Sequence, residues 1–142
     1  MKASIAKEYR WEMSHRLPCH NGMCKNIHGH SYKMRVEITG SLGENDMIMD
    51  YYSLDKIILP FVQALDHSFL CDEGDSAVLE FLSSNGFKHS VIKGSSTVEN
   101  IAWDFVSKVK PLIAEYKNIE LLKIRVYETE DSFAEVVEMM SL

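Results

Sequence analysis

The sequence predicts an α+β fold in which helices cover one face of an antiparallel sheet. Hydrophobic and polar residues alternate in two segments near the N-terminus and in one near the C-terminus, as is typical of half-buried strands. A further plausible strand follows the last of these. In the middle of the chain, hydrophobic residues recur at helical spacing instead. Pairs of strands that flank helical segments indicate an antiparallel sheet with helices on one side.

The first strand is predicted over 3–13 and the second over 32–39. The second has the clearest alternation in the chain, with one face formed by Tyr32, Met34, Val36 and Ile38. Turn residues are frequent between the two strands, and a further turn begins at Gly40. We therefore expect these strands to pair as a hairpin with a long connection on one side.

Hydrophobic residues at helical spacing predict a helix that reaches Leu65. Asp50 is its candidate cap, and Pro60 is expected to kink or shorten it. Residues 76–85 predict a short second helix that Gly86 stops.

A capping-box pattern, Ser96 followed three residues later by Glu99, predicts the start of another long helix. Alternation returns over 122–127, and 133–140 is a plausible final strand. The chain of 142 residues fits a single domain, 1–142.

The composition narrows the class of function. Hydrophobic residues make up 46% of the chain and charged residues 25%, as in soluble globular domains. The net charge of -6 disfavours non-specific binding of nucleic acid. No segment approaches the roughly 20 apolar residues that span a bilayer, and the N-terminus lacks the apolar core of a signal peptide. With an odd count of three cysteines, these features predict a cytoplasmic protein that binds neither nucleic acid nor membranes.

Three histidines are placed to bind one metal ion. His28 and His30 are two residues apart at the predicted start of a strand, so their side chains lie on the same side. His15 ends the first strand, and antiparallel pairing would bring it next to the other two. Three neutral imidazoles with an open fourth position are typical of catalytic zinc, which polarises a substrate hydroxyl or carbonyl. For any single histidine, a polar side chain in a loop is the simpler interpretation.

Cys24 lies four residues before His28. Beside a zinc ion and imidazoles, its thiol would be activated as a general base or nucleophile. A fourth zinc ligand and a small buried side chain remain open alternatives. Cys19 is a nearby competitor, whereas Cys71 is expected in the core.

Three further residues could take part in catalysis or binding. Adjacent Asp66 and His67 would form a proton relay if the carboxylate orients the imidazole, although composition alone favours a turn cap beside an exposed histidine. Glu128 continues the hydrophobic phase of the strand over 122–127. A carboxylate there is costly unless it is paired or binds a ligand, such as the paired N–H groups of an aminopyrimidine. The alternative is a strand end that reaches solvent.

Four short motifs together resemble those of the 6-pyruvoyl-tetrahydropterin synthases and the related 6-carboxytetrahydropterin synthases. Each motif is weak alone, but the four occur in the family's order and cover nearly the whole chain. They are His15-Arg16-Leu17-Pro18 with Cys24-Lys25-Asn26-Ile27-His28-Gly29-His30-Ser31-Tyr32, then Leu65-Asp66-His67, Ser96-Thr97-Val98-Glu99-Asn100 and Val126-Tyr127-Glu128-Thr129.

The resemblance implies a T-fold, in which a four-stranded antiparallel sheet has two long helices on one face. It also implies a homohexamer, a dimer of trimers, with active sites between subunits. The site residues that it implies are the Zn²⁺ ligands His15, His28 and His30, the proton-abstracting base Cys24, the relay Asp66 and His67, and the pterin-binding Glu128 with Thr97 nearby.

The expected reaction is the zinc-dependent conversion of 7,8-dihydroneopterin triphosphate to 6-carboxy-5,6,7,8-tetrahydropterin, with release of acetaldehyde and triphosphate, in queuosine and 7-deazapurine biosynthesis. The short Cys-x-x-x-His-Gly-His spacing favours this branch over 6-pyruvoyl-tetrahydropterin synthase, which eliminates triphosphate on the biopterin pathway. A non-catalytic, zinc-stabilised T-fold scaffold is the alternative from another class. A scaffold would need no base, proton relay or pterin-binding carboxylate.

The chain departs from the family pattern at three positions. Trp11 stands where Phe is usual, Met13 stands where a small residue is usual, and Cys19 is additional. These differences bear on the substrate pocket and on competition for zinc. Arg16 and Lys25 are candidate contacts to the triphosphate.

Overall fold

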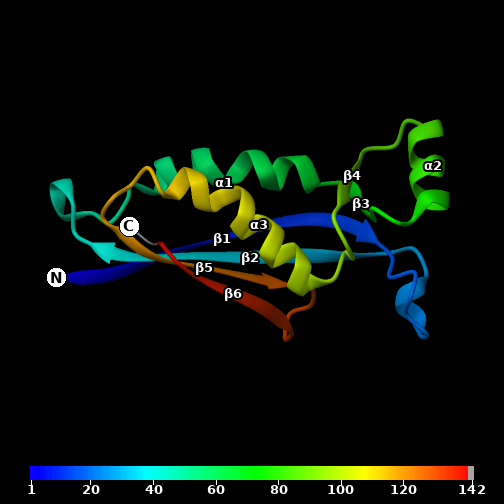
Figure 1. Ribbon diagram of the computed structural model, residues 1–142, viewed down its shortest axis with the longest axis horizontal. Helices are drawn as coiled ribbons and strands as arrows, with labels where there is room; N and C mark the ends of the chain where they lie inside the picture. The colour runs from blue at the N-terminus through cyan, green and yellow to red at the C-terminus, as the bar shows by residue number, and fades with distance from the viewer. Residues whose placement is uncertain (141–142) are drawn as a thin grey trace.

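The computed structural model describes residues 1–140, which form one six-stranded sheet with helices against it (Figure 1). The strands follow the spatial order β4-β3-β1-β2-β5-β6. They are β1 (Lys2–His15), β2 (His28–Ser41), β3 (Ser68–Asp72), β4 (His89–Ile92), β5 (Ile119–Tyr127) and β6 (Phe133–Met139). The α-helices are α1 (Tyr51–Leu65), α2 (Ser76–Ser84) and α3 (Val98–Ile113). Within residues 1–140, no helix is long and apolar enough to cross a membrane.

The predicted N-terminal hairpin is confirmed. β1 and β2 pair antiparallel along their whole length, from Lys2 opposite Ser41 to His15 opposite His28. Residues 16–27 form the long connection between the two strands, at the end of the hairpin that carries the histidines. Residues directly opposite in a sheet point to the same side, so this register places the histidines of both strands on one face. β5 and β6 extend the sheet antiparallel beyond β2, as predicted.

The expectation of a four-stranded sheet is wrong by two strands. β3 and β4 add a short parallel pair at the β1 edge, where Met13 lies opposite Ser68 and Phe69 opposite His89. All five residues of β3 are buried. A strand buried on both faces shows no alternation of polar and hydrophobic residues, and β4 has only four residues. Neither strand therefore has a period-two signal.

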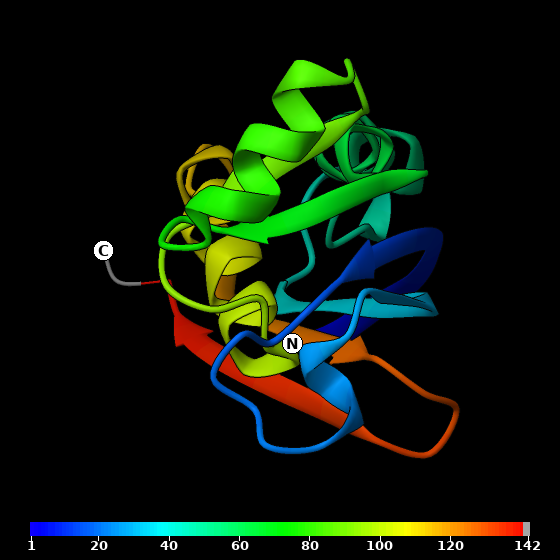
Figure 2. The ribbon, with the colours of Figure 1, turned by 90° about the vertical axis from the view of Figure 1, so that its right-hand side faces the viewer.

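The two long helices, α1 and α3, lie along the same side of the sheet, whereas α2 lies with β3 and β4 at one end of the molecule (Figures 1 and 2). Asp50 caps α1 as predicted, accepting a hydrogen bond from the Tyr52 N–H. Of the two effects expected of Pro60, shortening does not occur, because the helix continues to Leu65. Pro60 and Lys56 are exposed, so water can bond the carbonyl of Lys56 that the missing N–H leaves free.

The predicted capping box at the start of α3 is also wrong. Thr97, not Ser96, is the N-cap, and its hydroxyl accepts a hydrogen bond from the Asn100 N–H at 3.3 Å. Glu99 is exposed in the first turn. Ser96 is completely buried, and its polar atoms contact the end of β1 instead.

Thr97→Ala is expected to lower the free energy of unfolding by about 0.5–2 kcal/mol, because the first turn of α3 loses its cap. Thr97→Ser keeps the hydroxyl and should restore most of the loss. Urea denaturation of the three proteins measures the difference. Equal stability of Thr97→Ala and the parent chain would contradict a capping role.

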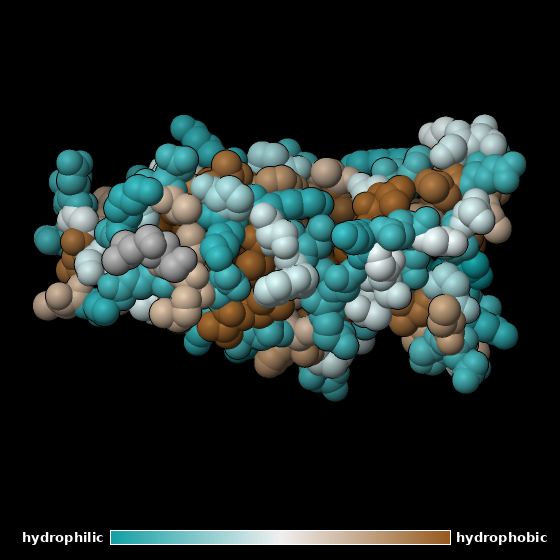
Figure 3. All heavy atoms as spheres, viewed as in Figure 1, coloured by the Kyte–Doolittle hydropathy of each residue, from teal (hydrophilic) through white to brown (hydrophobic). Residues whose placement is uncertain are grey.

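One hydrophobic core fills the space between the sheet and the long helices. Its completely buried members come from both layers and include Met34, Val36, Ile38, Leu54, Ile58, Val109, Leu122, Ile124 and Val126. Cys71 lies in a smaller buried cluster with Phe69 and Leu82, which confirms the prediction that it is a core residue. The face in Figure 3 is mostly hydrophilic, with small hydrophobic patches between polar side chains.

Candidate functional site

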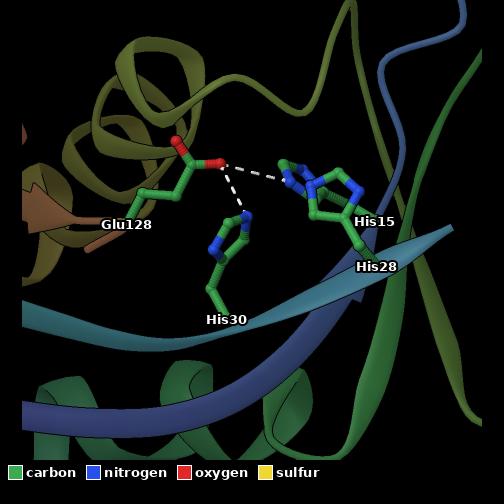
Figure 4. Close-up of side chains that lie close together, drawn as sticks. All are labelled: His15, His28, His30 and Glu128. Carbon is green, nitrogen blue, oxygen red and sulfur yellow. Dashed lines mark ion pairs between the residues drawn. The ribbon is translucent and has the colours of Figure 1, made fainter. Parts of the chain in front are cut away.

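Four side chains converge at the end of the sheet where β1 stops and β2 starts (Figure 4). His15, His28, His30 and Glu128 each offer one ligand atom, and these atoms all lie within 4.8 Å of one another. The histidines are brought together by the β1–β2 register. Glu128 follows β5, which pairs with β2. We call these four residues the His/Glu cluster.

Backbone carbonyls determine which nitrogen of two histidines carries hydrogen. His15 Nδ1 lies 2.9 Å from the carbonyl oxygen of Ser96, and His28 Nδ1 lies 2.7 Å from that of Asn26. A carbonyl only accepts hydrogen bonds, so each Nδ1 donates. The lone pair of each neutral ring is then on Nε2, which suits metal coordination.

Among residues 1–140, His30 has a buried nitrogen without a hydrogen-bond partner. Its Nε2 lies 3.0 Å from Glu128 Oε1, but the contact lacks hydrogen-bond geometry. Burial lowers the pKa of His30, the charges of His15 and His28 lower it further, and Glu128 opposes the change. A neutral imidazole with a buried, unpaired nitrogen is suited to bind a metal ion.

Glu128 supplies negative charge to the cluster. Its Oε1 lies 3.3 Å from His15 Nε2 as well as 3.0 Å from His30 Nε2. The close contact with His15, and the positive charge that His30 carries when protonated, lower the pKa of the carboxyl, against the effect of burial. Three imidazoles and one carboxylate form a donor set that fits a divalent cation. The cost of a half-buried carboxylate, noted from the sequence, is offset here by these partners.

Comparison with known proteins identifies the family. The family model for 6-pyruvoyl tetrahydropterin synthase matches residues 4–139. The chain belongs to this family. It is 32% identical to the 6-carboxy-5,6,7,8-tetrahydropterin synthase of Haemophilus influenzae over 94% of this chain and 98% of that protein. It is 29% identical to the enzyme of the same name from Aquifex aeolicus, over 97% of this chain and 99% of that protein.

Solved structures confirm the T-fold of the 6-pyruvoyl tetrahydropterin synthase family. An uncharacterised protein from Wolinella succinogenes superimposes with a TM-score of 0.82 at 18% identity, covering 96% of this chain and 98% of that one. The 6-pyruvoyltetrahydropterin synthase of Plasmodium vivax superimposes with a TM-score of 0.76 at 14% identity, covering 98% and 99%. β3 and β4 are thus additions to the expected sheet within the same fold.

The motif residues Asp66 and His67 form a pair, as the proton-relay hypothesis requires. His67 Nδ1 lies 2.9 Å from Asp66 Oδ2, and the other carboxylate oxygen accepts a hydrogen bond from the Glu12 N–H. That backbone bond, followed by the one with His67, lowers the pKa of Asp66. His67 is 77% exposed. It borders an open cavity of about 600 Å³ that His30 also lines, but no hydrogen bond or ion pair within residues 1–140 joins the Asp66–His67 pair to the His/Glu cluster.

Cys24 lies in a short 3-10 helix (Met23–Lys25) of the connection between β1 and β2. Its thiol is free and half-buried, and its carbonyl accepts a hydrogen bond from the Leu17 N–H at 2.8 Å. This bond folds the connection back, so that Cys24 lies beside the segment that follows His15. Cys19 is exposed and does not belong to the His/Glu cluster.

Arg16, a candidate contact to the triphosphate, is paired with a buried carboxylate. Its guanidinium donates two hydrogen bonds to Asp75, at 2.6 and 2.8 Å. Lys25 remains exposed. Thr97, expected near the pterin, uses its hydroxyl oxygen as the cap of α3.

Sequence reasoning missed two residues that contact His15. Ser96 accepts its Nδ1 hydrogen bond, and the hydroxyl of Tyr32 lies 3.5 Å from its Nε2. Ser96 belongs to one of the family-like motifs, but the capping-box pattern gave it a different role. Its side chain and carbonyl contact His15 only because the segment just before α3 lies against the end of β1.

Proposed function

We propose that this chain converts 7,8-dihydroneopterin triphosphate to 6-carboxy-5,6,7,8-tetrahydropterin, with release of acetaldehyde and triphosphate, as a zinc enzyme. Its family makes it an enzyme of the pterin synthase type, a lyase. The observation that supports the proposal most directly is the convergence of the His/Glu cluster at one end of the sheet. The names of the relatives from H. influenzae and A. aeolicus, together with the short spacing between Cys24 and His28, favour the carboxy product.

In this proposal His15, His28 and His30 hold Zn²⁺ through neutral imidazoles. When bound, the ion polarises the hydroxyls of the substrate side chain and makes the adjacent C–H and O–H bonds more acidic. The hydrogen bonds of His15 and His28 to backbone carbonyls direct their rings before the ion arrives. Ligands held in advance lose less freedom on binding.

Cys24 acts as the base that removes a proton from the substrate, and the Asp66–His67 pair moves protons on the other side of it. The Asp66 carboxylate holds the Nδ1 hydrogen of His67. That leaves His67 Nε2 to accept or return a proton. Zinc and a paired histidine on opposite sides of the substrate would allow the double bond to move around the pterin before triphosphate leaves.

Glu128 binds the pterin ring, with Thr97 nearby. An ionised carboxylate accepts the paired N–H groups of an aminopyrimidine edge, and the lowered pKa of Glu128 keeps it ionised. We place the enzyme in the cytoplasm, in queuosine and 7-deazapurine biosynthesis, as a homohexamer with active sites between subunits. The high exposure of His67 leaves it available at such a boundary.

Product analysis tests the proposal. The purified, zinc-loaded protein is incubated anaerobically with dihydroneopterin triphosphate, and the products are identified by mass spectrometry. We expect 6-carboxytetrahydropterin and acetaldehyde. 6-Pyruvoyl-tetrahydropterin without acetaldehyde would move the chain to the other branch of the family, and zinc binding without any turnover would favour the scaffold.

A further inference from the structure

The orientation of His15 depends on a single residue, Ser96, just before α3. His15 is completely buried, and its Nδ1 lies 2.9 Å from the Ser96 carbonyl oxygen and 3.2 Å from the Ser96 hydroxyl. The acceptor of the Nδ1 hydrogen sets both the tautomer and the direction of a metal-binding imidazole. The position of Ser96 therefore decides where His15 Nε2 points.

Ser96 is itself held by a buried carboxylate. Asp72 Oδ1 accepts a hydrogen bond from the Ser96 N–H at 2.8 Å, and Asp72 is only 8% exposed. A hydrogen bond to an ionised acceptor is roughly twice as strong as one between neutral groups. The Ser96 hydroxyl also donates to the carbonyl of Arg16, at 3.3 Å. The residue that contacts His15 is thus held through its own N–H and its hydroxyl.

The turn after β3 anchors this carboxylate and the residue next to His15 together. The Asp75 N–H donates to the Asp72 carbonyl at 3.0 Å, and the Asp75 carboxylate makes the paired hydrogen bonds with Arg16. Asp75 is buried as well. This turn is therefore linked to His15 in two ways. Asp72 bonds Ser96, which contacts His15, and Asp75 bonds Arg16, which follows His15 in the chain.

We infer that Asp72 is a positioning residue for the metal site. Its carboxylate holds Ser96 through the N–H of that residue, and the Ser96 carbonyl holds His15 with hydrogen on Nδ1 and with Nε2 directed at the ion. Asp72 is not a member of the His/Glu cluster, so it acts through Ser96 rather than as a ligand. The inference rests on the proposed function in one respect only, the binding of a metal ion by His15.

Zinc affinity of the purified full-length chain tests the inference, measured by competition with a chromogenic chelator. Asp72→Ala is expected to weaken zinc binding by about 10- to 100-fold, as is typical for loss of a group that orients a ligand. Asp72→Asn keeps an oxygen acceptor without the charge, so a smaller loss of about 3- to 10-fold is expected. The matched control is Glu73→Ala, which changes the net charge equally in the same turn, at an exposed side chain, and should bind zinc normally.

A second measurement separates positioning from folding. Long-range ¹H–¹⁵N spectra of the metal-free proteins report which His15 nitrogen carries hydrogen. The parent chain should show Nδ1–H, and Asp72→Ala should show a mixture of tautomers. If Asp72→Ala does not fold, Asp72→Asn alone decides the zinc comparison.

Unchanged zinc affinity and an unchanged His15 tautomer in the folded Asp72 variants would overturn the inference and leave the proposed function standing. A parent chain that binds no zinc would overturn the proposed metal site instead. In that case the tautomer spectra still decide whether Asp72 positions His15, because they are recorded without metal.

Discussion

His30→Ala is expected to abolish zinc binding and to lower turnover of dihydroneopterin triphosphate by at least about 10³-fold, since metal polarisation contributes several kcal/mol. His30 directs a buried, unpaired Nε2 toward the other three residues of the His/Glu cluster. Catalytic zinc ordinarily needs three protein ligands, and the variant keeps only two imidazoles. Metal content after dialysis and the rate of product formation measure the two effects.

Two companion variants make this result specific. His20→Ala removes an exposed histidine whose Nδ1 accepts a hydrogen bond from the Gly22 N–H, and it should keep both zinc and activity. Glu128→Ala should keep zinc, because the three imidazoles remain, but should weaken substrate binding. Loss of zinc from Glu128→Ala would show that the carboxylate is a ligand, and a full zinc content in His30→Ala would contradict the proposed site.

Cys24→Ala should lower turnover by about 10²- to 10⁴-fold, the usual contribution of a general base, without loss of zinc. The thiol is free, half-buried and four residues before His28. In Cys24→Ser the hydroxyl has nearly the same size as the thiol but is a much weaker acid. Turnover of this variant should therefore be almost as slow as that of Cys24→Ala. Steady-state kinetics and metal analysis on the same preparations give both quantities.

Cys19→Ala is the matched control for this change, because Cys19 is an exposed thiol in the same connection. It should leave turnover and zinc content as they are in the parent chain. Parent-like turnover of Cys24→Ala would remove Cys24 from the mechanism. Loss of zinc from that variant would instead support the ligand alternative that the sequence left open.

Local patterns predicted the elements that have one face in the core. β1, β2 and β5 alternate because successive side chains of a strand point to opposite faces, and α1 and α3 have a hydrophobic stripe because one side of each packs on the sheet. The grouping of His15 with His28 and His30 followed from the same logic. It needed only the phase of two strands and their antiparallel pairing.

Patterns failed where a residue's role depends on segments that are distant in sequence. β3 is buried on all five residues, so its contacts rather than its alternation define it. Ser96 matched a capping box, but burial against β1 gave that role to Thr97. The pairing of Arg16 with Asp75 joins residues 59 positions apart, so no local pattern indicated it.

The sequence by itself determined the strands and helices with one buried face, the family, and the set of histidines that can share an ion, because each depends on spacing along the chain. Only the tertiary structure decided which residues hold those histidines in position. The contact from His15 to Ser96 joins residues 81 positions apart, and that from Ser96 to Asp72 joins residues 24 apart. Such contacts arise when the segment before α3 meets the ends of β1 and β3, and no local spacing encodes them.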